Sequence, residues 1–189
     1  MNLEELAQRR SVPARQLGEP GLAGGELERL LAMAVRVPDH GHLTPWRMLL
    51  LRGPDLVAFG DRLAELAIEK NPDLPEHKRA KDRDRYHHAP LVIVVIARID
   101  AEHPKAPVQE QVISAGFVAY NLLQGAQALG CGAQLLTGWA AYDADVAALL
   151  GLAASERVIG FVHIGSPLVE APERLRPPLA DVVSDWHAP

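Results

Sequence analysis

The stretch "LVIVVIAR" at residues 91–98 decides the fold class of this chain. It is mostly β-branched, and it is apolar at odd and even positions alike, so the strand that it predicts has two apolar faces. A strand of this kind is buried on both sides. We therefore expect residues 91–98 to form a central strand of a sheet.

The segments on either side of this strand alternate between strand and helix patterns. Short apolar runs predict strands at residues 46–52, 132–138 and 157–165. Apolar residues at helical spacing, or small residues over a long run, predict helices at residues 3–9, 26–35, 54–70, 109–129 and 143–150.

The segment before the central strand breaks this pattern. After Pro72 and Pro75 it reads "EHKRAKDRDRYHH" over residues 76–88, with many charges and few apolar residues. Two alternatives fit this composition: a solvated helix, or a mobile excursion with the highest disorder in the chain. Its position between two core elements also raises the hypothesis of a lid.

The end of the chain is rich in proline. Prolines recur from Pro167 to Pro178 and favour an extended tail over residues 166–189, with Trp186 close to its end. A large aromatic side chain gains most when it is buried, so we expect the tail to lie along a partner subunit. No internal repeat or linker divides the chain, and we expect one domain over residues 1–189.

The composition is that of a globular protein and excludes several classes. The 189 residues are 48% hydrophobic and 23% charged, with a formal net charge of −5, which gives no general attraction to nucleic acid or to anionic membranes. Cys131 is the single cysteine, which excludes an intrachain disulfide and a four-thiolate zinc site. No secretory leader pattern or membrane-spanning apolar run is found, so we expect a cytoplasmic protein without nucleic-acid or membrane partners.

Two short motifs carry polar chemistry. Asp39, His40 and His42 stand close together in "DHGH", which would suit a metal hydrolase if further ligands were supplied. The other histidines stand in no recognisable metal-binding spacing, so a polar loop lining a cleft is the favoured interpretation. The second motif, "RRS" at residues 9–11, offers two guanidiniums and a hydroxyl group to a phosphate dianion.

Taken in chain order, these motifs resemble the nitroreductase family of flavoproteins, and most closely its short bacterial branch. The matching series is "RRS" (9–11), "RVPDHGHLTPWRMLLL" (36–51), "EQVISAGFVAYNLLQGAQALGCGAQLLTGW" (110–139) and "VIGFVHIGSP" (158–167). The resemblance implies an α+β fold with a mixed central sheet flanked by helices. It also implies an intertwined homodimer, with the C-terminal tail on the partner and one FMN in each of two interfacial clefts.

The resemblance also implies a set of cofactor-binding residues. At the flavin phosphate and ring edge they are Arg9, Arg10 and Ser11. On the loop that reaches the flavin of the other subunit they are Arg36, His40, Pro45 and Trp46. Along the second short strand they are Leu135, Leu136, Thr137 and Gly138. In the tail, Arg174 and Arg176 are alternatives for one basic contact to the phosphate.

The sequence departs from the family pattern at the second strand. Relatives often carry Trp-Arg or Trp-Lys before the hydroxyl residue, whereas this chain has Leu135 and Leu136 before Thr137. A cation that stabilises reduced flavin is therefore missing from that position, although Thr137 retains a hydroxyl group.

The activity that the resemblance implies is an FMN-dependent NAD(P)H oxidoreductase. Hydride passes from NADH or NADPH to FMN and then, in ping-pong order, to a nitroaromatic, quinone or related small-molecule acceptor. The flavin carries the chemistry, which is consistent with the lack of a catalytic triad or acid/base pair in the sequence. The missing cation keeps one alternative open, a flavin-binding or flavin-handling protein that turns over no nicotinamide.

Overall fold

The core of the protein is a five-stranded sheet. The computed structural model describes residues 2–188, apart from the side chain of Asp82. The strands are β1 (Leu17–Gly18), β2 (Trp46–Arg52), β3 (Leu91–Arg98), β4 (Gly132–Leu136) and β5 (Glu156–Pro167). Their order is β1-β5-β3-β2, and β4 also pairs with β5. The α+β architecture that the sequence predicts is confirmed.

The strand β3 lies inside the sheet, as predicted, between β2 and β5. All of the strand pairings among residues 2–188 are antiparallel, whereas a mixed sheet was expected. The pairing of β2 with β3 shows the reason, because the chain between them leaves and re-enters the sheet at one end, where Arg52 pairs with Leu91. A connection of that kind reverses the strand direction.

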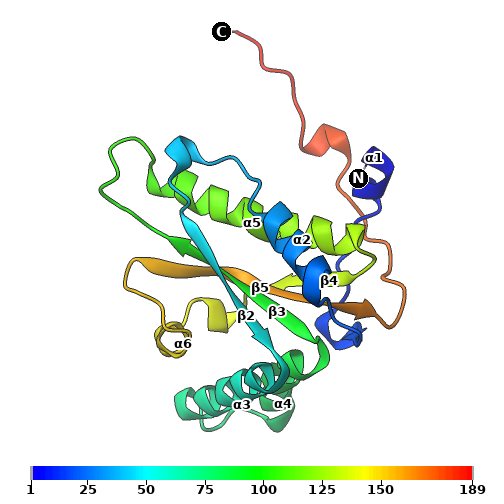
Figure 1. Cartoon of the computed structure of the whole chain (residues 1–189), viewed down its shortest axis with the longest axis vertical. Helices are drawn as coiled ribbons and strands as arrows, with labels where there is room; N and C mark the ends of the chain where they lie inside the picture. The colour runs from blue at the N-terminus through cyan, green and yellow to red at the C-terminus, as the bar shows by residue number, and fades with distance from the viewer. Residues whose placement is uncertain (1, 189) are drawn as a thin grey trace.

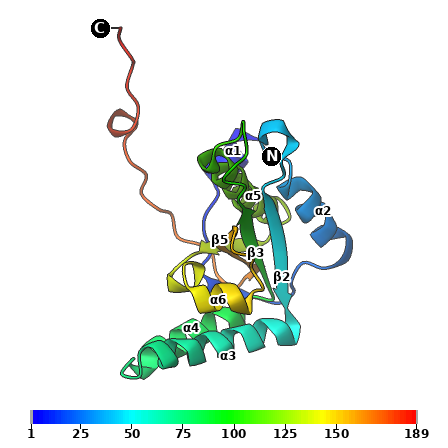
Figure 2. The same ribbon diagram turned by 90° about the vertical axis from the view of Figure 1, so that its left-hand side faces the viewer.

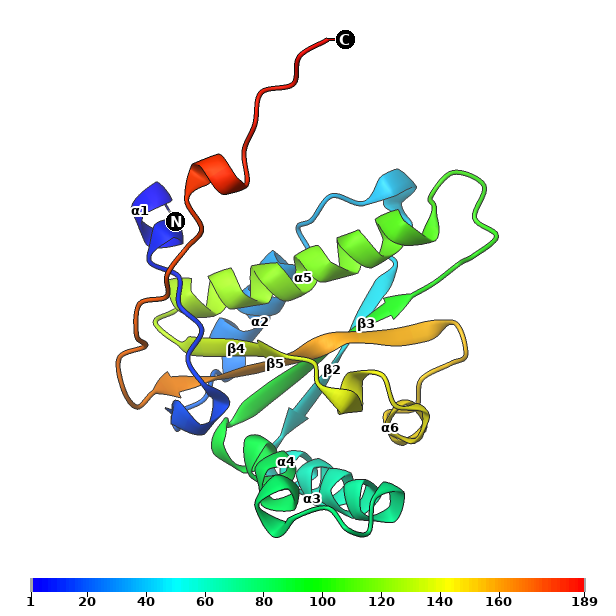
Figure 3. The same ribbon diagram turned by 180° about the vertical axis from the view of Figure 1, so that it is seen from behind.

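Helices cover both faces of the sheet (Figures 1 and 3). One face carries α2 (Gly24–Ala34) and α5 (Val108–Ala128), and the other carries α3 (Gly53–Lys70), α4 (Glu76–His88) and α6 (Ala144–Leu149). Alternate residues of β3 serve the two cores: Ile93 and Val95 face α2 and α5, while Val92 and Val94 face α3 and α4. All four side chains are fully buried, which explains the unbroken apolar run.

The charged segment before β3 is the helix α4, so the helical alternative is the one found. Tyr86 anchors it, because its ring packs edge-on against Phe59 of α3 at 5.1 Å and against Phe161 of β5 at 5.9 Å between centroids. One buried aromatic side chain therefore holds a helix that is otherwise mostly polar.

The N-terminal segment and the start of the C-terminal tail lie side by side. The short helix α1 (Leu3–Ala7) lies near the first part of the C-terminal tail, and the tail then projects away from the body (Figure 2). The extended part begins at Leu168, since β5 runs to Pro167. Trp186 keeps 81% of its surface exposed within the single chain. None of the helices formed by the described residues has both the length and the apolar character to span a bilayer.

Candidate functional site

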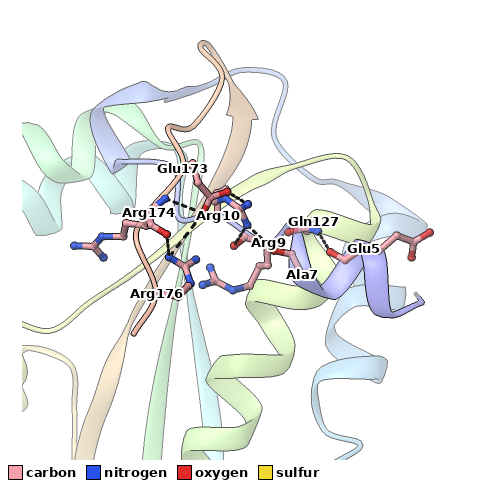
Figure 4. A network of polar contacts seen from close by, with 8 residues as sticks. All are labelled: Glu5, Ala7, Arg9, Arg10, Gln127, Glu173, Arg174 and Arg176. Atoms are coloured by element: carbon pink, nitrogen blue, oxygen red, sulfur yellow. Dashed lines mark hydrogen bonds and ion pairs between the residues drawn. The ribbon is translucent and has the colours of Figure 1, made fainter. Parts of the chain in front are cut away.

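A cavity of about 570 Å³ lies where the N-terminal segment, β4 and the tail meet. Two segments far apart in sequence supply its basic side chains, as Figure 4 shows. Its polar lining residues are Arg9, Arg10, Ser11, Gln134, Arg174 and Arg176. The structure thus brings together the "RRS" motif and both tail arginines that the sequence left as alternatives.

The cavity is strongly cationic. Glu173 is the carboxylate that pairs with Arg10, and it lies 4.0 Å from Arg176. Arg9 donates from Nη1 to the hydroxyl oxygen of Ser11 at 3.4 Å, and no carboxylate among residues 2–188 pairs with Arg9 or Arg174. Because four guanidiniums face one acid, the donor set fits a phosphate group.

Hydrogen bonds to the backbone hold the N-terminal arginine segment in place. Asn2 and Glu5 form a reciprocal cap that begins α1, and Gln127 of α5 donates from Nε2 to the carbonyl of Glu5 at 2.6 Å (Figure 4). The amide of Val12 then donates to the carbonyl of Ala133 at 3.0 Å. These bonds fix the segment between α5 and β4, so that the "RRS" motif faces the cavity.

The end of β4 extends the cavity toward α4. Side chains of a strand alternate, so Gln134 and Leu136 share the face that lines the cavity and its continuation. Leu135 points to the opposite face, where its Cδ1 lies only 2.5 Å from the position of a Cβ on Gly160. Within one chain, Gln134 and not Leu135 therefore lines the arginine cavity, and a contact between Leu135 and the cofactor stays a prediction.

A cation from α4 lies close to the segment in which the sequence lacks one. Arg85 lines two adjoining cavities, one with Gln134 and Leu136 and one with Leu136 and Thr137. Its Nη1 lies 3.8 Å from where a Cβ on Gly138 would stand, and the φ of Gly138 is +63°, a backbone conformation that glycine adopts readily. Sequence reasoning missed Arg85 because its side chain comes from a helix about fifty residues earlier.

The loop after α2 lies apart from this cavity. The Oδ2 atom of Asp39 accepts from the backbone amide of Thr44 at 2.9 Å, and Nδ1 of His40 lies 2.6 Å from Oε2 of Glu110 on α5. His42 and Thr44 hold left-handed backbone conformations, with φ of 57° and 51°. A strained loop secured at both ends is typical of a binding segment.

None of the four predicted residues on this loop lines the arginine cavity within one chain; they are Arg36, His40, Pro45 and Trp46. Arg36 and His40 are exposed, whereas Pro45 and Trp46 are buried. Trp46 packs in the core beneath α2 and α5, so its side chain supports the loop and does not present a surface to a ligand.

Comparison with known proteins now decides the family. The chain matches the nitroreductase family over residues 6–166. The Escherichia coli protein named "Putative NAD(P)H nitroreductase YdjA" is 31% identical over 176 residues, which cover 93% of each chain. A Haemophilus influenzae protein with a similar name is 33% identical and covers 86% of this chain and 87% of its own. The chain belongs to the nitroreductase family.

Solved structures agree with this assignment. A nitroreductase-like protein from Bacillus cereus superimposes with a TM-score of 0.80 at 25% identity, over 98% of this chain and 95% of its own. A Bacteroides fragilis nitroreductase with bound FMN superimposes with a TM-score of 0.73 at 21% identity, over 99% of this chain and 100% of its own. The protein is thus a nitroreductase-family oxidoreductase with the fold of that family.

Two further observations bear on the chemistry of this nitroreductase-family site. No group of three or more His, Cys, Asp or Glu side chains within the described residues is arranged to hold a metal ion, the "DHGH" loop included. His163 lies behind Tyr86, fully buried, and burial lowers its pKa to about 3, with a further contribution from Arg85. His163 is therefore neutral at ordinary pH and is not a general acid.

Proposed function

We propose that the chain is an FMN-dependent NAD(P)H oxidoreductase that passes electrons to a nitroaromatic, quinone or related acceptor. The observation that carries this proposal is the cavity in which four arginines meet the end of β4. The Bacteroides fragilis structure, which has the same fold and holds FMN, supports it.

The phosphate of FMN is assigned to the N-terminal arginines. Arg9 and Arg10 supply fork-shaped donors, and Ser11 supplies a hydroxyl group beside them. Arg174 and Arg176 enter the same cavity from the tail, so both tail arginines are candidates for the additional basic contact. Binding of a dianion offsets the mutual repulsion of these guanidiniums.

The ring of FMN is assigned to the end of β4. Gln134 and Thr137 offer hydrogen bonds to its polar edge, Gly138 lets the backbone approach closely, and Leu136 gives an apolar contact. Arg85 supplies the positive charge that Leu135 and Leu136 cannot. When bound, FMN would supply the hydride and electron chemistry, from NADH or NADPH to the acceptor in ping-pong order. These side chains would orient the flavin ring, and Arg85 would compensate the negative charge of the reduced form.

The second part of each site is assigned to a partner subunit. Arg36 and His40 lie away from the arginine cavity of their own chain, which supports a role at the FMN of a second copy. The helix α5 exposes Ile113, Phe117 and Tyr120, four and three residues apart and therefore on one face. We propose that this face and the projecting tail form the interface of a homodimer.

The first test is the cofactor content of the purified protein. A yellow protein whose ligand mass spectrometry identifies as FMN, with close to one FMN per chain, is the expected result. Arg9→Gln should lower that occupancy, while Arg29→Gln, which changes an exposed arginine on α2, should leave it unchanged. A colourless protein that takes up no added FMN would contradict the proposal.

The alternative without nicotinamide turnover rested on the missing cation. Arg85 supplies a cation at that place, which favours the enzyme. Stopped-flow mixing of FMN-loaded protein with NADH or NADPH separates the two functions. Rapid bleaching of the flavin absorbance is expected, and slow bleaching by both reductants would favour the binding protein.

A further inference from the structure

A second pocket of about 480 Å³ lies between the end of α3, α4 and the segment after β4. Neighbouring cavities share lining residues. Gln134 lines both the arginine cavity and its extension toward α4, and Lys81 lines both that extension and the second pocket. Trp139 lines both the second pocket and the small cavity at Thr137. The pocket therefore adjoins the cavities at the proposed ring edge.

Lysines dominate the charge of the pocket. Its lining residues are Ala67, Lys70, Leu74, Lys78, Lys81, Trp139 and Asp143. Lys70 lies 3.0 Å from Oδ2 of Asp143 and 2.5 Å from Oδ2 of Asp145, so those carboxylates offset its charge. Lys78 and Lys81 have no carboxylate partner within the described part of the chain.

The two lysines form a line with Arg85. Positions 78, 81 and 85 are three and four residues apart on α4 and therefore share one face of the helix. At the rise of an α-helix, Lys78 stands about 10 Å along the axis from Arg85. Cations thus run from the proposed ring edge outward, with the indole of Trp139 forming an apolar wall beside them.

We propose that this pocket binds the phosphorylated adenosine end of NADPH, an inference that rests on the proposed function and gives the enzyme a preference for NADPH over NADH. Lys78 and Lys81 bind the 2′-phosphate, which NADH lacks, and Trp139 contacts the adenine ring. The pocket volume lies within the range of small-molecule sites. One aromatic wall and two lysines without a carboxylate partner among the described residues suit a phosphate ester that carries an aromatic base.

The activity test compares the two reductants on FMN-loaded protein. For the wild type, kcat/KM should be higher with NADPH than with NADH. In Lys78→Gln/Lys81→Gln, the ratio of the two values should fall about tenfold, since at least one charge-assisted contact is lost. Lys105→Gln removes the same charge from an exposed loop outside the pocket and should leave the ratio unchanged.

A binding test separates failure of this inference from failure of the proposed function. Adenosine 2′,5′-bisphosphate should bind more tightly than adenosine 5′-monophosphate by calorimetry, and the double variant should lose that advantage. If the protein takes up no FMN but keeps this advantage, the proposed function fails and the pocket assignment stands.

Three results would overturn the assignment. They are equal binding of the two nucleotides, an unchanged reductant ratio in the double variant, and a loss confined to an anionic acceptor such as 4-nitrobenzoate. The last of these would identify the pocket as an acceptor site.

Discussion

The carboxylate of Glu173 lies against the guanidinium of Arg10, so one arginine of the cavity is already paired with an anion at the cavity's edge. An FMN phosphate at this site competes with that carboxylate for the same donors. Glu173→Gln should therefore strengthen FMN binding about threefold, a modest change because Glu173 is largely exposed. Titration of flavin fluorescence with apoprotein measures the dissociation constant.

A neighbouring tail residue supplies the control for this prediction. Glu170 is exposed and lies outside the arginine cavity, so Glu170→Gln should bind FMN as the wild type does. Weaker binding by Glu173→Gln would show instead that the carboxylate positions Arg10 for the phosphate.

Arg85 should raise the reduction potential of bound FMN. Its guanidinium adjoins Thr137 and Gly138, where it would stabilise the extra electron density of reduced FMN. Arg85→Gln should make the two-electron potential of bound FMN more negative by about 30 mV, which corresponds to one tenfold change in equilibrium constant. Dye-coupled spectrophotometric titration measures it. Arg85→Lys should restore most of the shift, and equal potentials in all three proteins would remove Arg85 from the flavin site.

The pair between Arg47 and Glu156 should stabilise the fold without touching the cofactor. Arg47 donates from Nε at 2.6 Å and from Nη2 at 2.8 Å to the carboxylate, whose pKa falls to about 2, chiefly through these hydrogen bonds. Because the folded-state pKa is lowered, this stabilisation is present above pH 4.5 and is lost as the pH falls toward 2.

Glu156→Gln should lower the free energy of unfolding by about 2 kcal/mol at pH 7, because it removes a half-buried, doubly hydrogen-bonded charge. Urea denaturation measures this value. Glu65→Gln breaks the exposed pair with Arg62 and should show no measurable loss. An equal loss in both variants would mean that the double hydrogen bond of Arg47 adds nothing.

His163 should make the protein sensitive to mild acid. Its pKa is about 3 in the folded protein, below its ordinary value of 6.5, so the unfolded chain takes up a proton that the folded chain excludes. Stability should therefore fall as the pH drops below 6.5 and continue to fall toward 3. Relative to His163→Leu, the wild type should lose roughly 2 kcal/mol between pH 7 and pH 5.

Chemical denaturation at several pH values measures this difference. His77→Gln changes an exposed histidine on α4 and should keep the wild-type pH dependence. Parallel stability curves for the wild type and His163→Leu between pH 7 and pH 5 would contradict the assignment.

Local patterns in the sequence were sufficient to predict most of the elements. The ends of β2 and β3 were predicted without error, because proline and polar residues bound both apolar runs. β1 was missed, since two residues paired only through Leu17 with Pro167 and Gly18 with Ser166 give no local signal.

The site was harder to predict because it depends on distant segments and on strand alternation. The motif at Arg9 and Arg10 was found, since charge and spacing are local properties. Arg85 was missed because tertiary packing of α4, through Tyr86, brings it to β4. That Leu135 points away from the arginine cavity was also not predicted, because a family pattern aligns positions but does not state which face of the strand a side chain occupies.

The exposed face of α5 gives the last prediction, which concerns assembly. Phe117 and Tyr120 are 41% and 50% exposed, although most other apolar side chains of α5 are buried. Burial of these two rings against a second copy of the chain would stabilise a dimer. Phe117→Arg should therefore produce a monomer in sedimentation analysis and should lower FMN occupancy, because Arg36 and His40 then lack the cavity of a partner. Val57→Arg, a change at a similarly exposed apolar residue on α3, should keep the dimer. If Phe117→Arg is monomeric but keeps full FMN occupancy, each site is complete within one chain. The contact of His40 with Glu110 of α5 would then have a structural role only.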